Sequence, residues 1–420
     1  MESVNDAGLH SRGQVSRLER SALRRALAIL GNPPIELVLW NGEVIRAGGA
    51  SPQVRVRISQ RGLLLRFLFR PDLYFGEAYA QGDVEIDGDL VALLGYLDPL
   101  DPQGVGAPLW ERLKLKFPKL APHRLARARS NIRHHYDLGN DFYRLWLDPD
   151  LVYTCAYYPT PTASLDDAQQ AKMEYVCRKL RLKPGETVVE AGCGWGAQAL
   201  YMARHYGVKV RAYNISQEQI KYARERARRE GLDGQVEFIE EDFSAIAESF
   251  DAFVSIGMLE HAGKDRYAEL GSVLERCLER GGRGLIHSIG RDRPLPLNAW
   301  IEQNIFPGAY PPALSEMLDV FKSGAFSVLD VENLRLHYAR TAEHWLARFE
   351  QSADRVEQMF DETFVRAWRF YLACAIHGFR SGWMQLFQIT FARAGASDLP
   401  WTRDYLYGQG LPGQREAPFQ

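Results

Sequence analysis

The chain has 420 residues, 25% of them charged, and a formal net charge of -2 at pH 7. This length predicts two or three domains, and the charge balance means that any attraction to an anionic surface must come from local patches. The five cysteines are scattered without a Cys-x-x-Cys pair, which argues against a disulfide framework and a zinc site, so no metal is expected.

The N-terminus and the hydropathy pattern argue against insertion into a membrane. Residues 1–6 lack the apolar core of a signal peptide, and no run of about 18 apolar residues occurs. Together with the unpaired cysteines, these features favour a cytoplasmic protein, which would meet a lipid only from the membrane surface.

Residues 1–105 are expected to form a small α/β domain. A helix is predicted over residues 14–30, where four leucines form one stripe with arginines interleaved. The stripe favours packing on the protein's own core, with a membrane-surface helix as the alternative. Two strands that flank the Asn41-Gly42 turn, a third over residues 54–58 and a helix over 63–69 follow.

Residues 106–135 are expected to be a basic linker. From Arg112 to Arg133 the segment carries many lysines and arginines and no acidic residue. A solvated linker and a polybasic patch for anionic lipid are equally good interpretations. Nucleic acid is not an expected partner, because aromatic residues are not interleaved as a stacking platform requires.

Residues 136–420 show a clear alternation of strands and helices. Strands are predicted at 188–189, 209–213, 236–238, 251–256 and 284–289, with a helix over 217–230 and two closing strands at 326–331 and 386–391. This pattern predicts a mostly parallel, doubly wound α/β sheet, Rossmann-like, with ligands at the carboxyl ends of the strands.

The most informative motif follows the first of these strands. Glu190 ends the strand, and Gly192, Gly194 and Gly196 follow at alternate positions before a helix. Glycines at this spacing let backbone N–H groups approach a ligand closely. A Gly-x-Gly-x-Gly turn is typical of S-adenosylmethionine sites, whereas dinucleotide sites usually carry Gly-x-Gly-x-x-Gly. Taken alone, the turn also fits a tight connection that binds nothing.

Further motifs fall at other strand ends or just before the first strand. They are HYDLGNDFY at 135–143 with YTCAYY at 153–158, NISQEQ at 214–219, IGMLEH at 256–261 and HSIG at 287–290. In this order they resemble the motifs of cyclopropane-fatty-acyl-phospholipid synthases, mycolic-acid cyclopropane synthases and related lipid methyltransferases over residues 130–395. FGEAY at 75–79 with Gly82-Asp83 is similar to the accessory domain of that family. The resemblance implies a class I methyltransferase fold with helical insertions.

The resemblance also implies two groups of site residues. Those that bind S-adenosylmethionine are Tyr136, Tyr153, Thr154, Glu190, Gly192, Gly194, Gly196, Asn214, Ile215, Gln219, Phe243 and Ser244. The family also holds a bicarbonate ion, at positions that match Cys155, Glu260, His287, Ile289 and Tyr338. Taken singly, Cys155, His287 and Tyr338 are more often ordinary core residues, and only their joint occurrence favours the functional interpretation.

The chemistry of these residue types agrees with that implication. The sulfonium methyl is a strong electrophile and a cis alkene a poor nucleophile, so alignment in a dry cavity can supply much of the rate. The carbocation that follows would gain from aromatic faces such as Tyr157, Tyr158 or Tyr338. A base must then remove a proton so that a ring closes. Bicarbonate suits this task because it is a mild base that can donate to Glu260 and accept from His287 and Tyr338.

An acyl groove is expected from the segments 294–310 and 341–379. Its apolar surface would come from Trp300, Ile301, Ile305, Phe306, Tyr310, Trp345, Phe349, Phe370, Phe379 and Trp383, although plain helix packing accounts for most of them. Three positions depart from the family pattern: Glu190 where Asp is frequent, Asn214 where Thr is frequent, and Leu259 where an aromatic residue stands.

The expected function is cyclopropanation of unsaturated acyl chains in membrane phospholipids, by an enzyme that contacts the anionic membrane surface. The resemblance to the family also implies a homodimer. Three alternatives stay open. They are a lipid methyltransferase that gives methylene or methyl-branched chains, an N-methyltransferase for a small amine, and a lipid-binding protein without activity.

Overall fold

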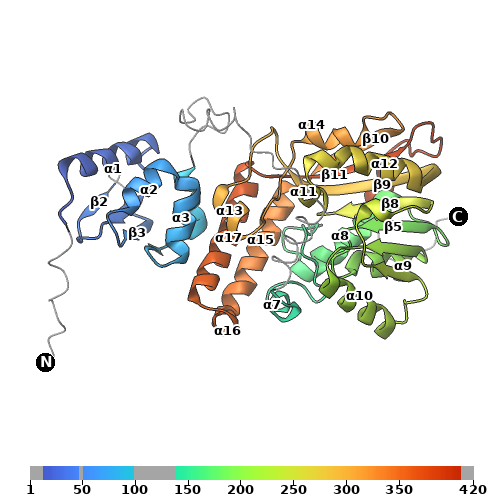
Figure 1. The fold of residues 1–420 in the computed structure, drawn as a ribbon, viewed down its shortest axis with the longest axis horizontal. Helices are drawn as coiled ribbons and strands as arrows, with labels where there is room; N and C mark the ends of the chain where they lie inside the picture. The colour runs from blue at the N-terminus through green and yellow to red at the C-terminus, as the bar shows by residue number, and fades with distance from the viewer. Residues whose placement is uncertain (1–12, 47–50, 99–137, 408–420) are drawn as a thin grey trace.

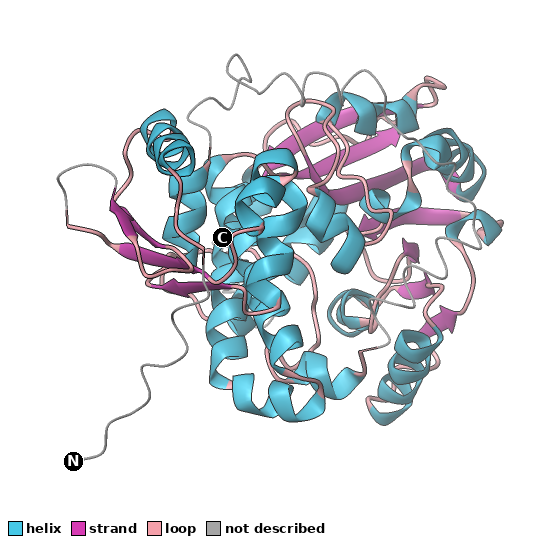
Figure 2. Ribbon diagram, turned by 60° about the vertical axis from the view of Figure 1, so that its left-hand side comes forward, coloured by secondary structure: helices cyan, strands magenta, loops and turns pink. Residues whose placement is uncertain are grey.

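The computed structural model describes residues 13–46, 51–98 and 138–407, and it contains two sheets with a layer of helices between them (Figure 1). The smaller sheet has the order β2-β1-β3-β4, and the larger has the order β10-β11-β9-β8-β5-β6-β7. Figure 2 shows the helical layer from a second direction.

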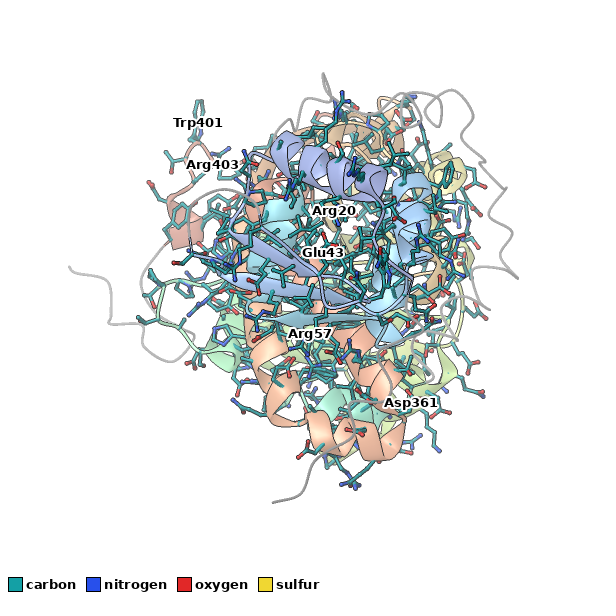
Figure 3. All side chains as sticks on the ribbon, turned by 90° about the vertical axis from the view of Figure 1, so that its left-hand side faces the viewer. Arg20, Glu43, Arg57, Asp361, Trp401 and Arg403 are labelled. Carbon is teal, nitrogen blue, oxygen red and sulfur yellow. The ribbon has the colours of Figure 1, made fainter. Side chains whose placement is uncertain are left out.

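Within the described ranges 13–46 and 51–98, the N-terminal part is a four-stranded sheet with four helices. In chain order the elements are α1 (Arg17–Ile29), β1 (Ile35–Val38), β2 (Val44–Arg46), β3 (Val54–Ile58), α2 (Leu63–Phe69), α3 (Pro71–Ala80), β4 (Val84–Asp87) and α4 (Leu90–Leu97). The hairpin predicted at Asn41-Gly42 is present, and Gly42 has the positive φ of 86° that the turn needs. An ion pair from Arg20 on α1 to Glu43 fastens the helix to this hairpin (Figure 3).

The leucine stripe of α1 divides between core and solvent. Leu27 is buried in the small core, Leu23 and Leu30 are half-buried, and Leu18 is 84% exposed. Packing on the core therefore accounts for only part of the stripe.

The large sheet follows the predicted doubly wound pattern. Its strands are β5 (Thr187–Ala191), β6 (Lys209–Tyr213), β7 (Val236–Ile239), β8 (Phe250–Ile256), β9 (Leu278–Gly290), β10 (Phe326–Asn333) and β11 (Gln385–Arg393). The five strands from β9 to β7 are parallel, and β11 and β10 pair antiparallel at one edge. The strand order reverses between β5 and β8, which is where ligands bind in open α/β sheets.

Helices cover both faces of this sheet because each strand alternates its side chains. Val188 faces α8 (Leu165–Leu180), α9 (Ala197–Tyr206) and α10 (Gln217–Arg229), whereas Val189 faces α12 (Tyr267–Cys277). The remaining helices are α7 (Asn140–Arg144), α11 (Leu259–Ala262), α13 (Ala299–Asn304), α14 (Leu314–Met317), α15 (Arg335–Gln351), α16 (Ala353–Met359), α17 (Glu362–Ser381) and α18 (Asp404–Tyr407).

Helix α17 joins the two parts of the molecule. It packs against α3 and α4, and the Arg366 side chain donates to the carbonyl oxygens of Tyr79 and Val84 at 2.6 and 2.8 Å. At Gly76 on α3, a Cβ atom would lie 2.7 Å from ring carbons of both Phe370 and Trp300. The glycine of the FGEAY motif therefore permits the close contact between the accessory part and the helical layer.

The α/β fold class, with a small N-terminal α/β part and helical insertions, is confirmed. Strand β4 and helices α3 and α4 were not anticipated from the sequence. The predicted linker 106–135 and the boundaries at 105 and 136 lie outside the described residues. No helix within the described ranges is long and apolar enough to cross a membrane.

Candidate active site

One cavity of about 1400 Å³ extends from the glycine turn after β5 to helices α1 and α2. Pockets for small ligands usually occupy roughly 300–1000 Å³, so this cavity has room for more than one such molecule. Its wall at the glycine turn carries charged and amide side chains, and most of the rest is apolar. We call these two parts the cofactor end and the acyl end.

The glycine turn needs glycine for conformation and for space. Gly192, Gly194 and Gly196 have φ values of 85°, 52° and 85°, in the left-handed region. A Cβ on Gly192 would lie 2.9 Å from the Cβ of Met258, which follows β8. Gly192 and Gly194 line the cavity, whereas Gly196 packs against Phe238 and precedes α9.

The segment after β6 is tied directly to this turn. Asn214, Ile215 and Gln219 all line the cavity. The Asn214 side-chain amide donates to the carbonyl of Gly194 at 3.3 Å and to Gln219 Oε1 at 2.8 Å. Asn214 at this position therefore joins two predicted cofactor segments into one wall.

Of the predicted cofactor residues Phe243 and Ser244, only Phe243 lines the cavity. The Arg266 guanidinium lies 4.2 Å from the centre of the Phe243 ring. Ser244 is not part of the wall, and its backbone N–H donates to Asp242 Oδ1 at 3.0 Å. Asp242 lines the cavity and pairs with Arg266 at 2.6 Å, so the site contains Asp242 and Phe243 but not Ser244.

A buried lysine completes the cofactor end and was not anticipated from the sequence. Lys172 on α8 lines the cavity, and its Nζ donates to Thr154 Oγ1 at 3.1 Å. Burial lowers the pKa of Lys172 to about 8 and raises that of the nearby Glu190 to about 7. Glu190 Oε2 is buried without a hydrogen-bond partner in the described part of the chain. The sequence does contain a sign of this role, because Lys172 stands on the apolar face of its helix, where a lysine is unusual.

The other predicted residues near the lysine differ in their positions. Tyr153 and Thr154 line the cavity, and the Tyr153 hydroxyl lies 2.9 Å from that of Tyr371. Cys155 is fully buried behind this wall, with its thiol directed at backbone carbonyls. Burial raises the pKa of the Cys155 thiol far above its ordinary value, so it stays protonated. Tyr136 lies outside the described residues.

Glu260 on α11 lies buried where the cofactor end meets the acyl end. Ser288 Oγ donates to Glu260 Oε2 at 2.8 Å, and the Ile289 amide donates to Oε1 at 3.3 Å. Burial raises the pKa of Glu260 to about 7 despite these donors. The Ile289 amide, predicted to contact an anion, thus contacts the Glu260 carboxylate in this structure.

His287 presents a free ring nitrogen in the same region. Its Nδ1 lies 3.0 Å from the side-chain amide nitrogen of Gln388, and its Nε2 has no partner among the described residues. Burial lowers the pKa of His287 well below its ordinary value, so the ring is neutral. With Gln388 as the donor, the proton lies on Nε2 and is available to a ligand.

The aromatic residues expected to shield a cation fall into two groups. Tyr338 on α15 lines the cavity, stacked 4.3 Å from Phe379. Tyr157 and Tyr158 do not line the cavity, and both stack on His337 instead. Six of the apolar residues predicted for an acyl groove line the cavity: Ile301, Phe306, Trp345, Phe370, Phe379 and Trp383. Four others pack elsewhere: Trp300, Ile305, Tyr310 and Phe349.

Residues 123–389 match the family described as "Mycolic acid cyclopropane synthetase", and residues 22–97 match a domain of unknown function. A probable fatty acid methyltransferase of Pseudomonas putida is 34% identical over 385 residues, 89% of this chain and 96% of that protein. The cyclopropane-fatty-acyl-phospholipid synthase of Escherichia coli (strain K12) is 34% identical over 359 residues, 83% of this chain and 90% of that protein.

The solved structure of mycolic acid cyclopropane synthase CmaA1, complexed with SAH and CTAB, superposes with a TM-score of 0.60. It is 30% identical in sequence, and the match covers 65% of this chain and 99% of that one.

Proposed function

The chain belongs to the mycolic acid cyclopropane synthetase family of S-adenosylmethionine-dependent fatty-acyl methyltransferases, and we propose that it cyclopropanates unsaturated acyl chains of phospholipids. The methyl group of S-adenosylmethionine would be added to a cis double bond, and loss of a proton from that methyl group would close the ring. The observation that carries this proposal is the joint position of Glu260, His287 and Tyr338 in one cavity with the glycine turn.

At the cofactor end, the chain's own residues suit a charged methyl donor. Gly192 and Gly194 let the backbone approach it closely, and Asn214 and Gln219 offer amide groups beside the turn. Thr154, which accepts a hydrogen bond from Lys172, also lines this end of the cavity. S-adenosylmethionine bound here would supply the electrophilic methyl group.

Between the two ends, the donor set suits a small oxyanion. His287 Nε2 is a buried donor without a partner, and Glu260, with a pKa of about 7, carries a proton in much of the population near neutral pH. A protonated Glu260 donates to an anion instead of repelling it. The residues therefore fit bicarbonate, which would supply a weak base for the proton lost on ring closure. Cys155 and Ile289 belong to this proposal only through the family positions.

At the acyl end, aromatic rings keep water from the reacting carbons. Tyr338, Phe379 and Trp345 line the cavity, and the Tyr338 ring packs against the other two. Ring faces in a dry cavity stabilise a carbocation by roughly 0.5–2 kcal/mol each.

The proposed membrane-contact surface is formed by α1 and α2. Leu18, Ile29, Leu65, Leu68 and Phe69 are exposed on these two short helices, and the acyl end of the cavity extends between them. Arginines beside these residues suit an anionic bilayer. We also propose that the enzyme is cytoplasmic, binds peripherally to the membrane and forms a homodimer. Its proposed parts are those expected from the sequence: a domain over residues 1–105, a linker over 106–135 and a domain over 136–420.

A second candidate is methylation without ring closure, because a 34% identical relative is named a probable fatty acid methyltransferase. One reaction separates the two. The purified chain is incubated with S-adenosylmethionine and vesicles of cis-unsaturated phospholipid, with and without bicarbonate, and the lipid is studied by proton NMR. Ring-proton signals that grow with bicarbonate are expected. A methylated lipid without them supports the second candidate, and methylation of a soluble amine alone would point to an N-methyltransferase.

A further inference from the structure

Arg291 lies in the wall of the cavity, directly after β9, the strand that carries His287 and Ile289 of the proposed anion site. Successive side chains of a strand point to opposite faces, so His287, Ile289 and Arg291 share one face. All three line the cavity, whereas Ser288 and Gly290 do not. Four residues of extended backbone separate the Cα atoms of His287 and Arg291 by roughly 13 Å. From Arg291 the chain continues to residues 295–298, which also line the cavity.

Arg291 is buried without a counter-charge among the described residues. Its exposed fraction is 7%, its Nε has no hydrogen-bond partner, and no carboxylate pairs with it. Arg226 is equally buried, at 7%, but pairs with both Asp150 and Glu230. Burial lowers the pKa of Arg291 to about 10, the direction expected for a cation that is not compensated, yet it remains charged at neutral pH.

A buried guanidinium without a partner is costly to the folded protein, because desolvation is not offset by an ion pair. A ligand that brings an oxyanion into the cavity would remove that cost and gain charge-assisted hydrogen bonds. Arginine suits a phosphate oxyanion because its planar fork can donate two parallel bonds.

The position of Arg291 in the cavity favours contact with the headgroup of a lipid. It does not favour contact with the small anion proposed to bind near Glu260 and His287. The residues that follow it, 292–294, are exposed, and Leu295, Pro296, Leu297 and Asn298 line the same cavity. A lipid whose double bond lies near His287 would therefore have its polar end toward this exposed loop.

We propose that Arg291 binds the phosphodiester of the phospholipid substrate and thereby sets which double bond along the acyl chain reaches the methyl donor. This inference rests on the proposed function, since it assumes a lipid in the cavity. Arg291 acts as a specificity residue, because it touches the headgroup and not the reacting carbons.

The test is equilibrium binding of a short-chain phosphatidylglycerol and of the matching diacylglycerol, which lacks the phosphate, to the full chain by calorimetry. Arg291→Met is expected to weaken phosphatidylglycerol binding about tenfold and to leave diacylglycerol binding within about twofold. Arg291→Lys should retain part of the affinity. Arg229→Met, at an exposed position on α10, controls for the change in net charge. Thermal unfolding and S-adenosylmethionine binding verify that each variant is folded.

The inference is overturned by equal weakening of binding of both lipids, by unchanged binding of both, or by a raised bicarbonate requirement with unchanged lipid preference. A free fatty acid, included as a third ligand, separates carboxylate from phosphate recognition, and stronger dependence of its binding on Arg291 would also contradict the phosphodiester assignment. Methyl transfer, measured separately on long-chain phospholipid, reports on the proposed function, so failure of that reaction is distinguishable from failure of the Arg291 assignment.

Discussion

The two ends of the cavity are built in different ways. At the cofactor end, Gly192, Asn214 and Gly257 each follow a parallel strand directly, so the sheet alone brings them together. At the acyl end, the wall comes from Gly76, Ile301 and Phe370, which lie on three helices far apart in the sequence. The first end depends on local turns and the second on packing between distant segments. Variants should therefore separate binding of the methyl donor from events on the lipid.

The largest expected effect is at Glu260, where the two ends meet. Glu260→Gln keeps the shape of the side chain but removes its ability to ionise, and we expect the rate of ring formation to fall about 100-fold or more. The residues proposed to hold S-adenosylmethionine are others, at the cofactor end, so we expect its Kd to change less than threefold. Product formation and calorimetry measure the two quantities. Equal loss of both would mean that Glu260 supports the whole cavity and has no separate role in ring closure.

A substitution at the acyl end should affect packing before cofactor binding. In Gly76→Ala the new methyl group would meet the rings of Trp300 and Phe370 at 2.7 Å, so we expect a cost of about 1–3 kcal/mol in the free energy of unfolding. Gly62→Ala is the matched control, because its Cβ meets open space at a negative φ. Denaturant unfolding measures both variants. If Gly76→Ala were as stable as the control, the N-terminal part could move away from the helical layer at little cost, and the close contact at Gly76 would not stabilise the fold.

At the cofactor end, Lys172 should matter for the methyl donor. Lys172→Met removes the donor to Thr154 and leaves Glu190 and Asp148 without a nearby cation, and we expect the Kd of S-adenosylmethionine to rise about tenfold. Lys172→Arg keeps the charge and should lose less. Calorimetry of the Lys172 variants gives the Kd of S-adenosylmethionine and the Kd of the short-chain phospholipid, and so measures binding at each end of the cavity. If lipid binding falls and cofactor binding does not, the division between the ends is wrong.

The smallest effect is a pH dependence of stability that comes from Glu260. Its pKa is raised by burial to about 7, so the folded state binds a proton that the unfolded state releases near pH 4.5. The stabilisation is complete below pH 4.5 and is lost as the pH rises through 7.

The difference in unfolding free energy between wild type and Glu260→Gln should therefore grow by roughly 1 kcal/mol for each pH unit from 7 down to 5. Chemical denaturation at several pH values measures this. Parallel pH curves for the two proteins would mean that Glu260 is already ionised in the folded state.

The parts of this protein that were predictable from sequence are those with a local cause. Alternating glycines, the Asn-Gly turn and apolar strand runs identified the sheet, the hairpin and the glycine turn, and the match to the cyclopropane synthetase family confirms the resemblance. Asn214 could be placed near the turn because parallel strands end at one edge of the sheet.

Residues whose environment is made by distant segments could not be placed in this way. In the sequence, Lys172 is an ordinary charged residue of a helix and Arg291 one that follows a strand. Only the fold shows that both are buried beside the cavity. Tyr157 and Tyr158 adjoin a predicted cofactor segment, but His337 on α15 stacks against both and holds them outside the cavity.

The central claim is that a methyl group passes from the cofactor end to an alkene at the acyl end. The transferred methyl carbon then loses a proton as the ring closes. The most direct measurement uses S-adenosylmethionine with a trideuterated methyl group, cis-unsaturated phospholipid vesicles, mass spectrometry of the acyl chains to count deuterium, and proton NMR to separate a ring from a methylene group of the same mass. We predict a saturated ring product that retains two of the three deuterium atoms. A product that retains all three would contradict ring closure, and an unlabelled acyl chain would contradict methyl transfer itself.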